Sequence, residues 1–98
     1  MARYDFIATY IMANRKNGAI YTGFSRDLPA RVGQHKRGIG SRFTAKYRCY
    51  TLVWFERFDD VAFAMRREKQ IKRYPRRWKV NLIEAHNPVW LDLSRELV

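Results

Sequence analysis

Five side chains in the sequence are of the types that phosphate chemistry uses, and they are spread over its first two thirds. They are two phenols, a guanidinium, an imidazole and a carboxylate: Tyr10, Tyr21, Arg31, His35 and Glu68. A guanidinium can bind phosphate through two parallel hydrogen bonds, and an imidazole exchanges protons near neutral pH. A carboxylate can bind Mg²⁺, which often uses only one or two carboxylates and keeps several waters. These groups could bind a phosphate and move a proton if the fold brings them together.

The two tyrosines lie in segments that predict the strands of a hairpin. Residues 6–12 (FIATYIM) and 19–23 (AIYTG) are rich in β-branched and aromatic residues, and an Asn-Gly pair between them favours a tight turn. With an even-length loop, Tyr10 and Tyr21 point to the same face of the sheet. A four-residue loop, residues 14–17, places them directly opposite each other, and a two-residue loop separates them along that face. Taken alone, two such tyrosines are more often core or surface aromatics than functional groups.

Arg31 and His35 lie one turn apart on a predicted helix. Asp27 can cap the start of this helix, and we expect Gly38 and Gly40 to end it and open a loop. Residues four apart on a helix are neighbours, so Arg31 and His35 project together. Alone, such a pair is usually a solvated surface. Beside the tyrosines it becomes a phosphate clamp with a titratable neighbour.

Glu68 interrupts the apolar face of a helix that we expect over residues 61–73. It lies three residues from both Met65 and Ile71. A carboxylate on that face needs a partner, because an uncompensated buried charge is costly. Two interpretations remain open: an ion pair with Arg31 or a lysine, or ligation of Mg²⁺ or Mn²⁺. The other acidic residues form no cluster, so any metal-dependent phosphate chemistry here should use one metal ion.

Three further segments complete the predicted fold. A third strand is expected over residues 50–56 (YTLVWFE), followed by Asp59 or Asp60 as the cap of the helix over 61–73, which Pro75 ends. A last helix is expected over residues 76–85. Its predicted apolar stripe is Trp78, Leu82 and Ile83, and the tail after it is predicted to fold back through Trp90 and Leu93. The order β-β-α-β-α-α predicts an α/β domain of the α+β type.

The bulk composition bounds the partners and the size. The 98 residues, 47% apolar, are expected to form one domain, 1–98. The formal net charge of +11 favours a nucleic-acid partner over a merely solvated basic surface or anionic lipid. Cys49 is the only cysteine, which excludes an internal disulfide and fits a reducing cytoplasm. We expect it to be buried rather than catalytic, and no segment has the length and apolarity to cross a membrane.

The order and spacing of several short motifs, spread over nearly the whole chain, resemble one known family. The motifs are Ala8-Thr9-Tyr10, Tyr21-Thr22-Gly23, Asp27-Leu28 with Arg31 and His35, Phe43-Thr44 with Tyr47, and residues 67–72 (REKQIK). This pattern resembles the GIY-YIG nuclease domain, and specifically a small single-domain bacterial branch similar to the N-terminal nuclease half of the excinuclease of nucleotide-excision repair. Ala8-Thr9 and Thr22 depart from the residues of the family name, while both tyrosines remain.

The resemblance implies a fold and an activity. The implied fold is a three-stranded antiparallel sheet flanked by helices, and the implied activity is metal-dependent hydrolysis of DNA, with repair or recombination as the expected setting. Glu68 is then the ligand of a single Mg²⁺ or Mn²⁺, and Arg31 holds the scissile phosphate. Tyr10, Tyr21 or His35 would deprotonate or orient the attacking water. Gly23 suits a close approach of the backbone below the site.

The basic side chains predict how nucleic acid is held. The candidate contacts are Arg31, Lys36, Arg42, Lys69 and Lys72. DNA is favoured over RNA by the resemblance, although the residues themselves do not distinguish the two. Core packing is the preferred interpretation of Tyr47, Tyr50 and Trp54, with stacking on unpaired bases as the alternative. Longer members of the family that the sequence resembles carry an asparagine after the metal-binding glutamate. Lys79 lies near that position here, and Asn81 and Asn87 are candidates displaced from it. Asn87 is expected instead to fix the tail.

Two rival hypotheses belong to other functional classes. The first is a nucleic-acid-binding module whose nuclease fold has lost its activity, which the net charge supports. The second is a protein–protein adaptor, which no feature of the sequence supports. The sequence leaves the oligomeric state open, a homo-oligomer included.

Overall fold

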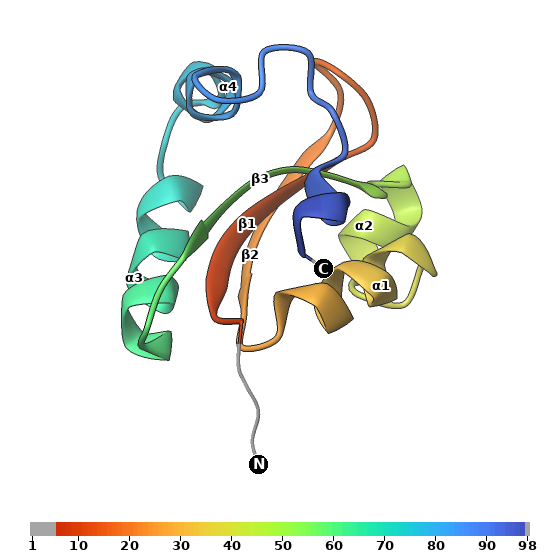
Figure 1. The fold of residues 1–98 in the computed structure, drawn as a ribbon. Coiled ribbons are helices and arrows are strands. Elements are labelled where there is room, and N and C mark those ends of the chain that lie inside the picture. The colour runs from red at the N-terminus through yellow and green to blue at the C-terminus, as the bar shows by residue number, and fades with distance from the viewer. Residues whose placement is uncertain (1–5, 98) are drawn as a thin grey trace.

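The fold is built on a three-stranded antiparallel sheet. A computed structural model describes residues 6–97. Strands β1 (Ala8–Ala13), β2 (Ile20–Ser25) and β3 (Thr51–Arg57) are arranged in the order β2-β1-β3, with β1 in the centre (Figure 1). The predicted α+β class and its three strands are confirmed.

Within residues 6–97, four α-helices and one 3₁₀ helix flank the sheet. They are α1 (Leu28–Lys36), α2 (Arg42–Tyr47), α3 (Val61–Lys72), α4 (Arg76–Glu84) and η1 (Leu93–Leu97). The predicted order omitted α2 and was wrong there. Ser41 caps this six-residue helix by accepting the backbone N–H of Thr44 at 3.1 Å, and Arg48 ends it in a left-handed conformation with φ 57°. A helix this short shows no apolar period in the sequence.

The hairpin that joins β1 and β2 sets the relation of the two tyrosines. Tyr10 pairs with Gly23, and Met12 pairs with Tyr21, so both tyrosines face the same side of the sheet, as predicted. The alternatives that gave a two- or four-residue loop were wrong. The loop spans residues 14–19 and is closed by Asn14, whose Oδ1 accepts the N–H of Ala19 at 2.9 Å.

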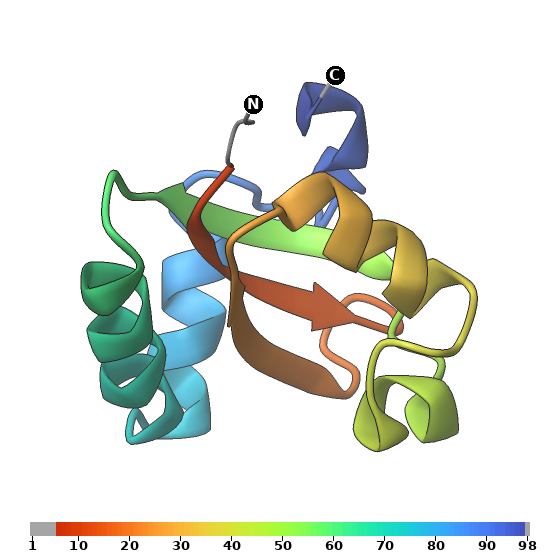
Figure 2. The ribbon, with the colours of Figure 1, turned by 90° about the horizontal axis from the view of Figure 1, so that it is seen from below.

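Helices pack on both faces of the sheet. Tyr10 and Met12 of β1 point toward Leu28 and Val32 of α1. The alternate residues of β1 point to the opposite face, where they join Ile71 of α3 and a residue of α4; these buried partners are Ile11, Ala13, Ile71 and Ile83. Figure 2 shows α3 and α4 to one side of the sheet, with α1 and α2 to the other.

A β-bulge in β3 is held by the tail of the chain. Ile11 pairs with Trp54 but Met12 pairs with Leu52, which leaves Val53 as the extra residue. Asn87 donates from Nδ2 to the carbonyl of Val53 at 3.0 Å and is 4% exposed, so its predicted role in fixing the tail is confirmed.

The tail also packs through Trp90 and Leu93, as predicted. Trp90 is buried, donates from Nε1 to Glu84 at 2.7 Å, and adopts φ 59°. Leu93 packs against the core on the α1 side of the sheet. Cys49 is buried, as expected.

Two apolar predictions were wrong. Trp78 was placed on the buried stripe of α4, but it is 55% exposed, and only Ile83 of that stripe is fully buried. Met65 was placed on the apolar face of α3, but it is 39% exposed, while Ala64 and Ile71 are fully buried. Both helices bury a narrower face than the sequence pattern suggests, because each packs beside a small sheet. Among residues 6–97, no helix combines the length and apolarity needed to span a membrane.

Candidate active site

A cleft of about 560 Å³ lies beside the edge strand β2, between α1 and α3. Four of the five predicted site residues line it. Its lining comprises Tyr10, Tyr21, Phe24, Ser25, Arg26, Asp27, Ala30, Arg31, Gln34 and Glu68. The fifth predicted residue, His35, lies behind this wall.

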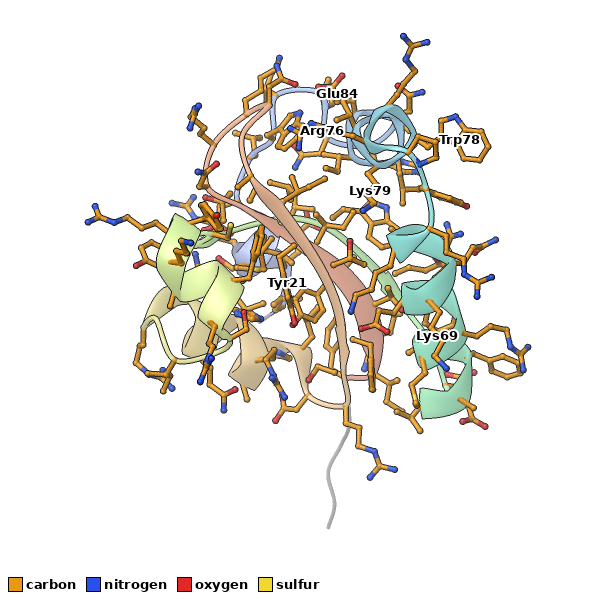
Figure 3. All side chains as sticks on the ribbon, turned by 180° about the vertical axis from the view of Figure 1, so that it is seen from behind. Tyr21, Lys69, Arg76, Trp78, Lys79 and Glu84 are labelled. Atoms are coloured by element: carbon orange, nitrogen blue, oxygen red, sulfur yellow. The ribbon has the colours of Figure 1, made fainter. Side chains whose placement is uncertain are left out.

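The position of β2 at the sheet edge explains how Arg31 and Glu68 meet. Arg31 comes from α1, whose apolar residues pack on the Tyr10 face, and Glu68 comes from α3, whose apolar residues pack on the opposite face. Only at an edge can groups from both faces line one cleft. Successive residues of β2, Phe24 and Ser25, point to opposite faces and both line it. Figure 3 shows Tyr21 on the side of β2 where α1 and α2 lie.

The two tyrosines form a close aromatic pair over a glycine. The ring centroids of Tyr10 and Tyr21 are 6.3 Å apart. A Cβ atom at position 23 would lie 2.7 Å from the hydroxyl oxygen of Tyr10 and 3.0 Å from the ring of Tyr21. The expected close approach at Gly23 is therefore present, and the phenol of Tyr10 occupies the space that any larger residue would need.

His35 is fully buried and supports Tyr10 from behind. Its Nε2 lies 2.7 Å from the hydroxyl of Tyr10, and its Nδ1 lies 2.9 Å from Oγ1 of Thr44. Thr44 donates its own hydroxyl proton to the carbonyl of Ser41 at 3.3 Å, which leaves its oxygen to accept from Nδ1–H. In the tautomer that satisfies this chain, Nε2 accepts the proton of Tyr10.

Burial sets the protonation of this pair. Burial is the largest cause of the raised pKa of Tyr10. The charges of Tyr21 and Glu68 raise this pKa further, while the charge of Arg31 lowers it. Burial, followed by the nearby charge of Arg31, lowers the pKa of His35 to about 4. At neutral pH the pair therefore consists of a phenol and a neutral imidazole that can accept a proton.

Glu68 faces the cleft with little solvent contact. Its side chain is 14% exposed, and Oε2 pairs with Nζ of Lys72 at 2.9 Å, one turn along α3. The lysine form of the predicted ion pair is thus present. A carboxylate in this position fits a hard cation, because Mg²⁺ needs few protein oxygens and completes its shell with water and phosphate.

Asp27 is the other carboxylate among the described residues that line the cleft. Its Oδ1 accepts the N–H of Ala30 at 3.2 Å as the cap of α1. Within residues 6–97, no group of three or more His, Cys, Asp and Glu side chains is arranged to hold a metal. The donor set fits an ion held by Glu68 together with water and substrate, not a preformed protein cage.

The predicted nucleic-acid contacts are divided among several surfaces. Arg31 lines the cleft, and Lys72 lies at its border through its pair with Glu68. Lys36 bonds to Asp92 and to the carbonyl of Tyr50, outside the cleft. The other two lie elsewhere: Lys69 on the outer side of α3, and Arg42 at the start of α2.

Sequence reasoning missed the support that α2 provides. Thr44 was matched only as part of a motif, and Ser41 was not singled out. Phe43 of the same helix stacks on Tyr21 with centroids 6.1 Å apart. Gly40 is required beside His35, since a Cβ there would lie 2.2 Å from Nδ1. The available signal was the serine three residues before Thr44, which is the spacing of a helix cap.

The aromatic residues considered for base stacking are of two kinds. Trp54 is buried at 6% exposure, which confirms core packing for it. Tyr47 and Tyr50 are exposed at 42% and 37%, so core packing was the wrong interpretation for these two. Of the candidates near a family asparagine position, Asn81 is exposed and Lys79 partly buried.

Comparison with known proteins identifies the family. Residues 6–81 match the model of the GIY-YIG catalytic domain. UPF0213 proteins of Staphylococcus aureus strains Mu3 and N315 are each 40% identical over 68 residues, which is 69% of this chain and 83% of theirs. The solution structure of a UPF0213 protein from Bacillus halodurans matches with a TM-score of 0.52 and 31% identity, covering 83% of this chain and 85% of that one. The chain therefore belongs to the GIY-YIG family, with small UPF0213 proteins among its relatives.

Proposed function

We propose that this protein is a divalent-metal-dependent endonuclease that hydrolyses phosphodiester bonds in DNA. The observation that carries the proposal is one cleft in which a guanidinium, a carboxylate and a phenol backed by a neutral imidazole converge. These are Arg31, Glu68, Tyr10 and His35. GIY-YIG membership places the chain in a nuclease family and supports nucleic acid as its substrate.

Arg31 and Glu68 have complementary roles in this proposal. The guanidinium of Arg31 binds non-bridging oxygens of the scissile phosphate and holds it against the tyrosine pair. Glu68 would hold Mg²⁺ or Mn²⁺, and that ion, when bound, supplies charge neutralisation to the phosphate and to the leaving oxygen. Lys72 must leave Glu68 for this, and a released lysine beside the cleft can bind an adjacent phosphate.

Tyr10 and His35 provide a route for the proton of the attacking water. His35 does not line the cleft, so it can receive that proton only through the hydroxyl of Tyr10. Water gives its proton to the Tyr10 oxygen while Tyr10 gives its own to Nε2 of His35. Tyr10 ends neutral, and His35 ends as an imidazolium whose Nδ1–H donates to Oγ1 of Thr44. Tyr21 orients the water from the other side of the cleft.

The decisive experiment compares Glu68→Gln with wild type. Supercoiled plasmid, branched DNA and flapped DNA are incubated with Mg²⁺ or Mn²⁺, since repair and recombination intermediates are the substrates to test first. We expect cleavage by wild type, loss of at least about 100-fold in Glu68→Gln, and full activity in the exposed control Glu96→Gln. Wild type that cuts nothing on this panel, or a Glu68→Gln protein that cuts equally well, contradicts the proposal.

A non-cleaving nucleic-acid-binding module is the second candidate. The net charge of +11 favours it, because phosphate binding needs only a basic surface. Binding without cleavage by both wild type and Glu68→Gln would select it.

A further inference from the structure

A second groove, of about 470 Å³, lies between α3 and α4. Its lining residues are Arg66, Lys69, Gln70, Arg73, Tyr74 and Trp78. We call it the α3–α4 groove. None of these residues lines the cleft of Tyr10 and Glu68, which is on another side of α3.

Trp78 is the unusual residue of this groove. Of the three tryptophans in the sequence, Trp54 and Trp90 are 6% and 5% exposed, while Trp78 is 55% exposed. Figure 3 shows its indole directed from α4 away from the sheet. Tyr74 packs against it nearly edge-on, with ring centroids 5.3 Å apart at 70°, and Tyr74 is tied by its hydroxyl to Arg67 at 3.2 Å. An indole held from one side and open on the other is suited to stacking.

The cations of the α3–α4 groove are uncompensated. Arg66, Lys69 and Arg73 form no ion pair with any residue among 6–97, whereas Lys72 and Arg67 on the same helix each pair with a glutamate. Among the described residues, no carboxylate lines the groove. A surface with this charge and one open indole is complementary to a polyanion that carries flat rings.

Basic side chains mark a path around α3 from the cleft to the groove. At 3.6 residues per turn, Lys72, Lys69, Arg73 and Arg66 follow Glu68 around α3 at about 40°, 100°, 140° and 160°, all in the same direction. The opposite direction leads to Ala64 and Ile71, which are fully buried against the sheet. A strand that leaves the cleft beside Glu68 can therefore cross α3 past these basic side chains, with Met65 and Ala62 between them at about 60° and 120°.

We propose that the α3–α4 groove binds an unpaired segment of the nucleic acid whose scissile phosphate lies in the cleft. Trp78 stacks on a base, and Arg66, Lys69 and Arg73 contact the phosphates on either side. The segment is unpaired because a base inside a duplex already stacks on its neighbours and offers no free face. This inference rests on the proposed function for the register of the strand, but binding in the groove requires no cleavage.

The fluorescence of Trp78 gives a direct test. The full chain carrying Glu68→Gln is titrated with an oligothymidylate of about 12 nucleotides, a length within the footprint of single-strand-binding folds. A blunt DNA duplex of the same length is the comparison probe. We expect the oligothymidylate to quench the tryptophan emission and to shield it from acrylamide. The same titration of Trp78→Phe should show neither change, since the other two tryptophans are buried.

Variants measure the contribution of each part. Trp78→Ala should weaken oligothymidylate binding by roughly five- to one-hundred-fold, and Trp78→Phe by less, because a phenyl ring still stacks. Replacing Arg66, Lys69 and Arg73 together by Gln should lower the slope of log affinity against log salt by about 2. Leu91→Ala and Arg95→Gln, exposed residues outside the groove, are the matched controls and should change neither.

Several outcomes overturn the inference. They are an unchanged Trp78 emission on binding, an equal response to the duplex, and no binding of either probe. An acidic protein partner would be the alternative occupant in the last case. If Trp78 responds but wild type cuts no DNA, the proposed function fails and the groove stands. If wild type cuts DNA and Trp78 stays silent, the groove fails alone.

Discussion

The two faces of the sheet bury different kinds of side chain. The face under α3 and α4 buries mainly aliphatic and indole groups such as Ile11 and Ile71, and its fully buried Thr9 donates to the carbonyl of Ala64 at 2.7 Å. The face under α1 and α2 buries Tyr10 and His35 at 1% exposure or less, together with Thr44. Buried polar groups cost free energy unless they are hydrogen-bonded, and these three are bonded to one another. The α1 face therefore combines an apolar cluster with a hydrogen-bonded polar support behind the cleft.

The largest expected effect comes from the polar face. In the proposed mechanism, Tyr10→Phe removes the hydroxyl that passes the proton to His35, so it should slow cleavage by about 100- to 10,000-fold, as expected for loss of general base catalysis. Single-turnover cleavage of a labelled DNA substrate measures this. Tyr50→Phe, which alters an exposed tyrosine outside the cleft, is the control. Equal rates for Tyr10→Phe and wild type would show that the phenol only packs.

On the face of the sheet under α3 and α4, a substitution should lower stability rather than activity. Ile83 is fully buried, and Ile83→Ala should lower the free energy of unfolding by about 2–5 kcal/mol, since it removes apolar contacts and leaves a cavity. Urea denaturation measures the loss. The cleavage rate per folded molecule should stay close to that of wild type. A cleavage rate per folded molecule that falls along with the free energy of unfolding would show that the two faces do not differ in this way.

His35 should make stability depend on pH. The pKa of His35 is about 4 in the folded protein and about 6.5 in the unfolded chain. Between pH 6.5 and 4, the unfolded chain therefore binds a proton at His35 that the folded protein does not bind. The free energy of unfolding should therefore fall as pH drops from 6.5 to 4, by about 2–3 kcal/mol, and this contribution should level off below pH 4. Denaturation at a series of pH values shows the slope.

Two variants separate His35 from other titrating groups. His35→Gln should flatten the slope between pH 6.5 and 4, whereas His86→Gln, at an exposed position, should retain it. A wild-type protein equally stable at pH 6.5 and pH 4.5 would mean that His35 is protonated without penalty in the folded state.

The smallest expected effect concerns Thr44. Thr44→Val removes the acceptor of His35 Nδ1–H and leaves a buried donor unbonded, at a cost of about 1–2 kcal/mol. Because His35 can then adopt the other tautomer, cleavage should fall further than stability alone explains, and its pH profile should shift. Thr51→Val, in β3, serves as the control. A normal pH profile in Thr44→Val would limit Thr44 to a structural role.

The sequence contained enough information for the three strands, for α1 and for the phase of Glu68. β-Branched and aromatic residues are concentrated in the strands, and Asp27 and Asp60 both cap helices as their positions suggest. Glu68 was identifiable because its position three residues before Ile71 conflicts with an apolar face. Signals of this kind are local, and they do not depend on the rest of the fold.

What could not be predicted depends on contacts between distant segments. α2 is a six-residue helix that holds Thr44 in hydrogen-bond contact with His35, nine residues away in the sequence. Trp78 looked like a core residue because an exposed indole has no signature in a helical period. The depth of His35 was also hidden, since Arg31 one turn earlier lines an open cleft. Helical phase places residues on one side of a helix but does not tell which of them the neighbouring elements cover.

The tail after α4 also bears on how copies of the protein meet in solution. Strand β3 lies at an edge of the sheet, where free backbone groups can recruit a strand from another molecule and start aggregation. Asn87 donates to the carbonyl of Val53, and Asp92 accepts the N–H of Leu52 at 3.3 Å. The bulge also interrupts the regular spacing of backbone donors and acceptors along β3. The tail therefore blocks strand pairing at the β3 edge. This protection against aggregation would matter for a small basic protein when many copies bind one polyanion.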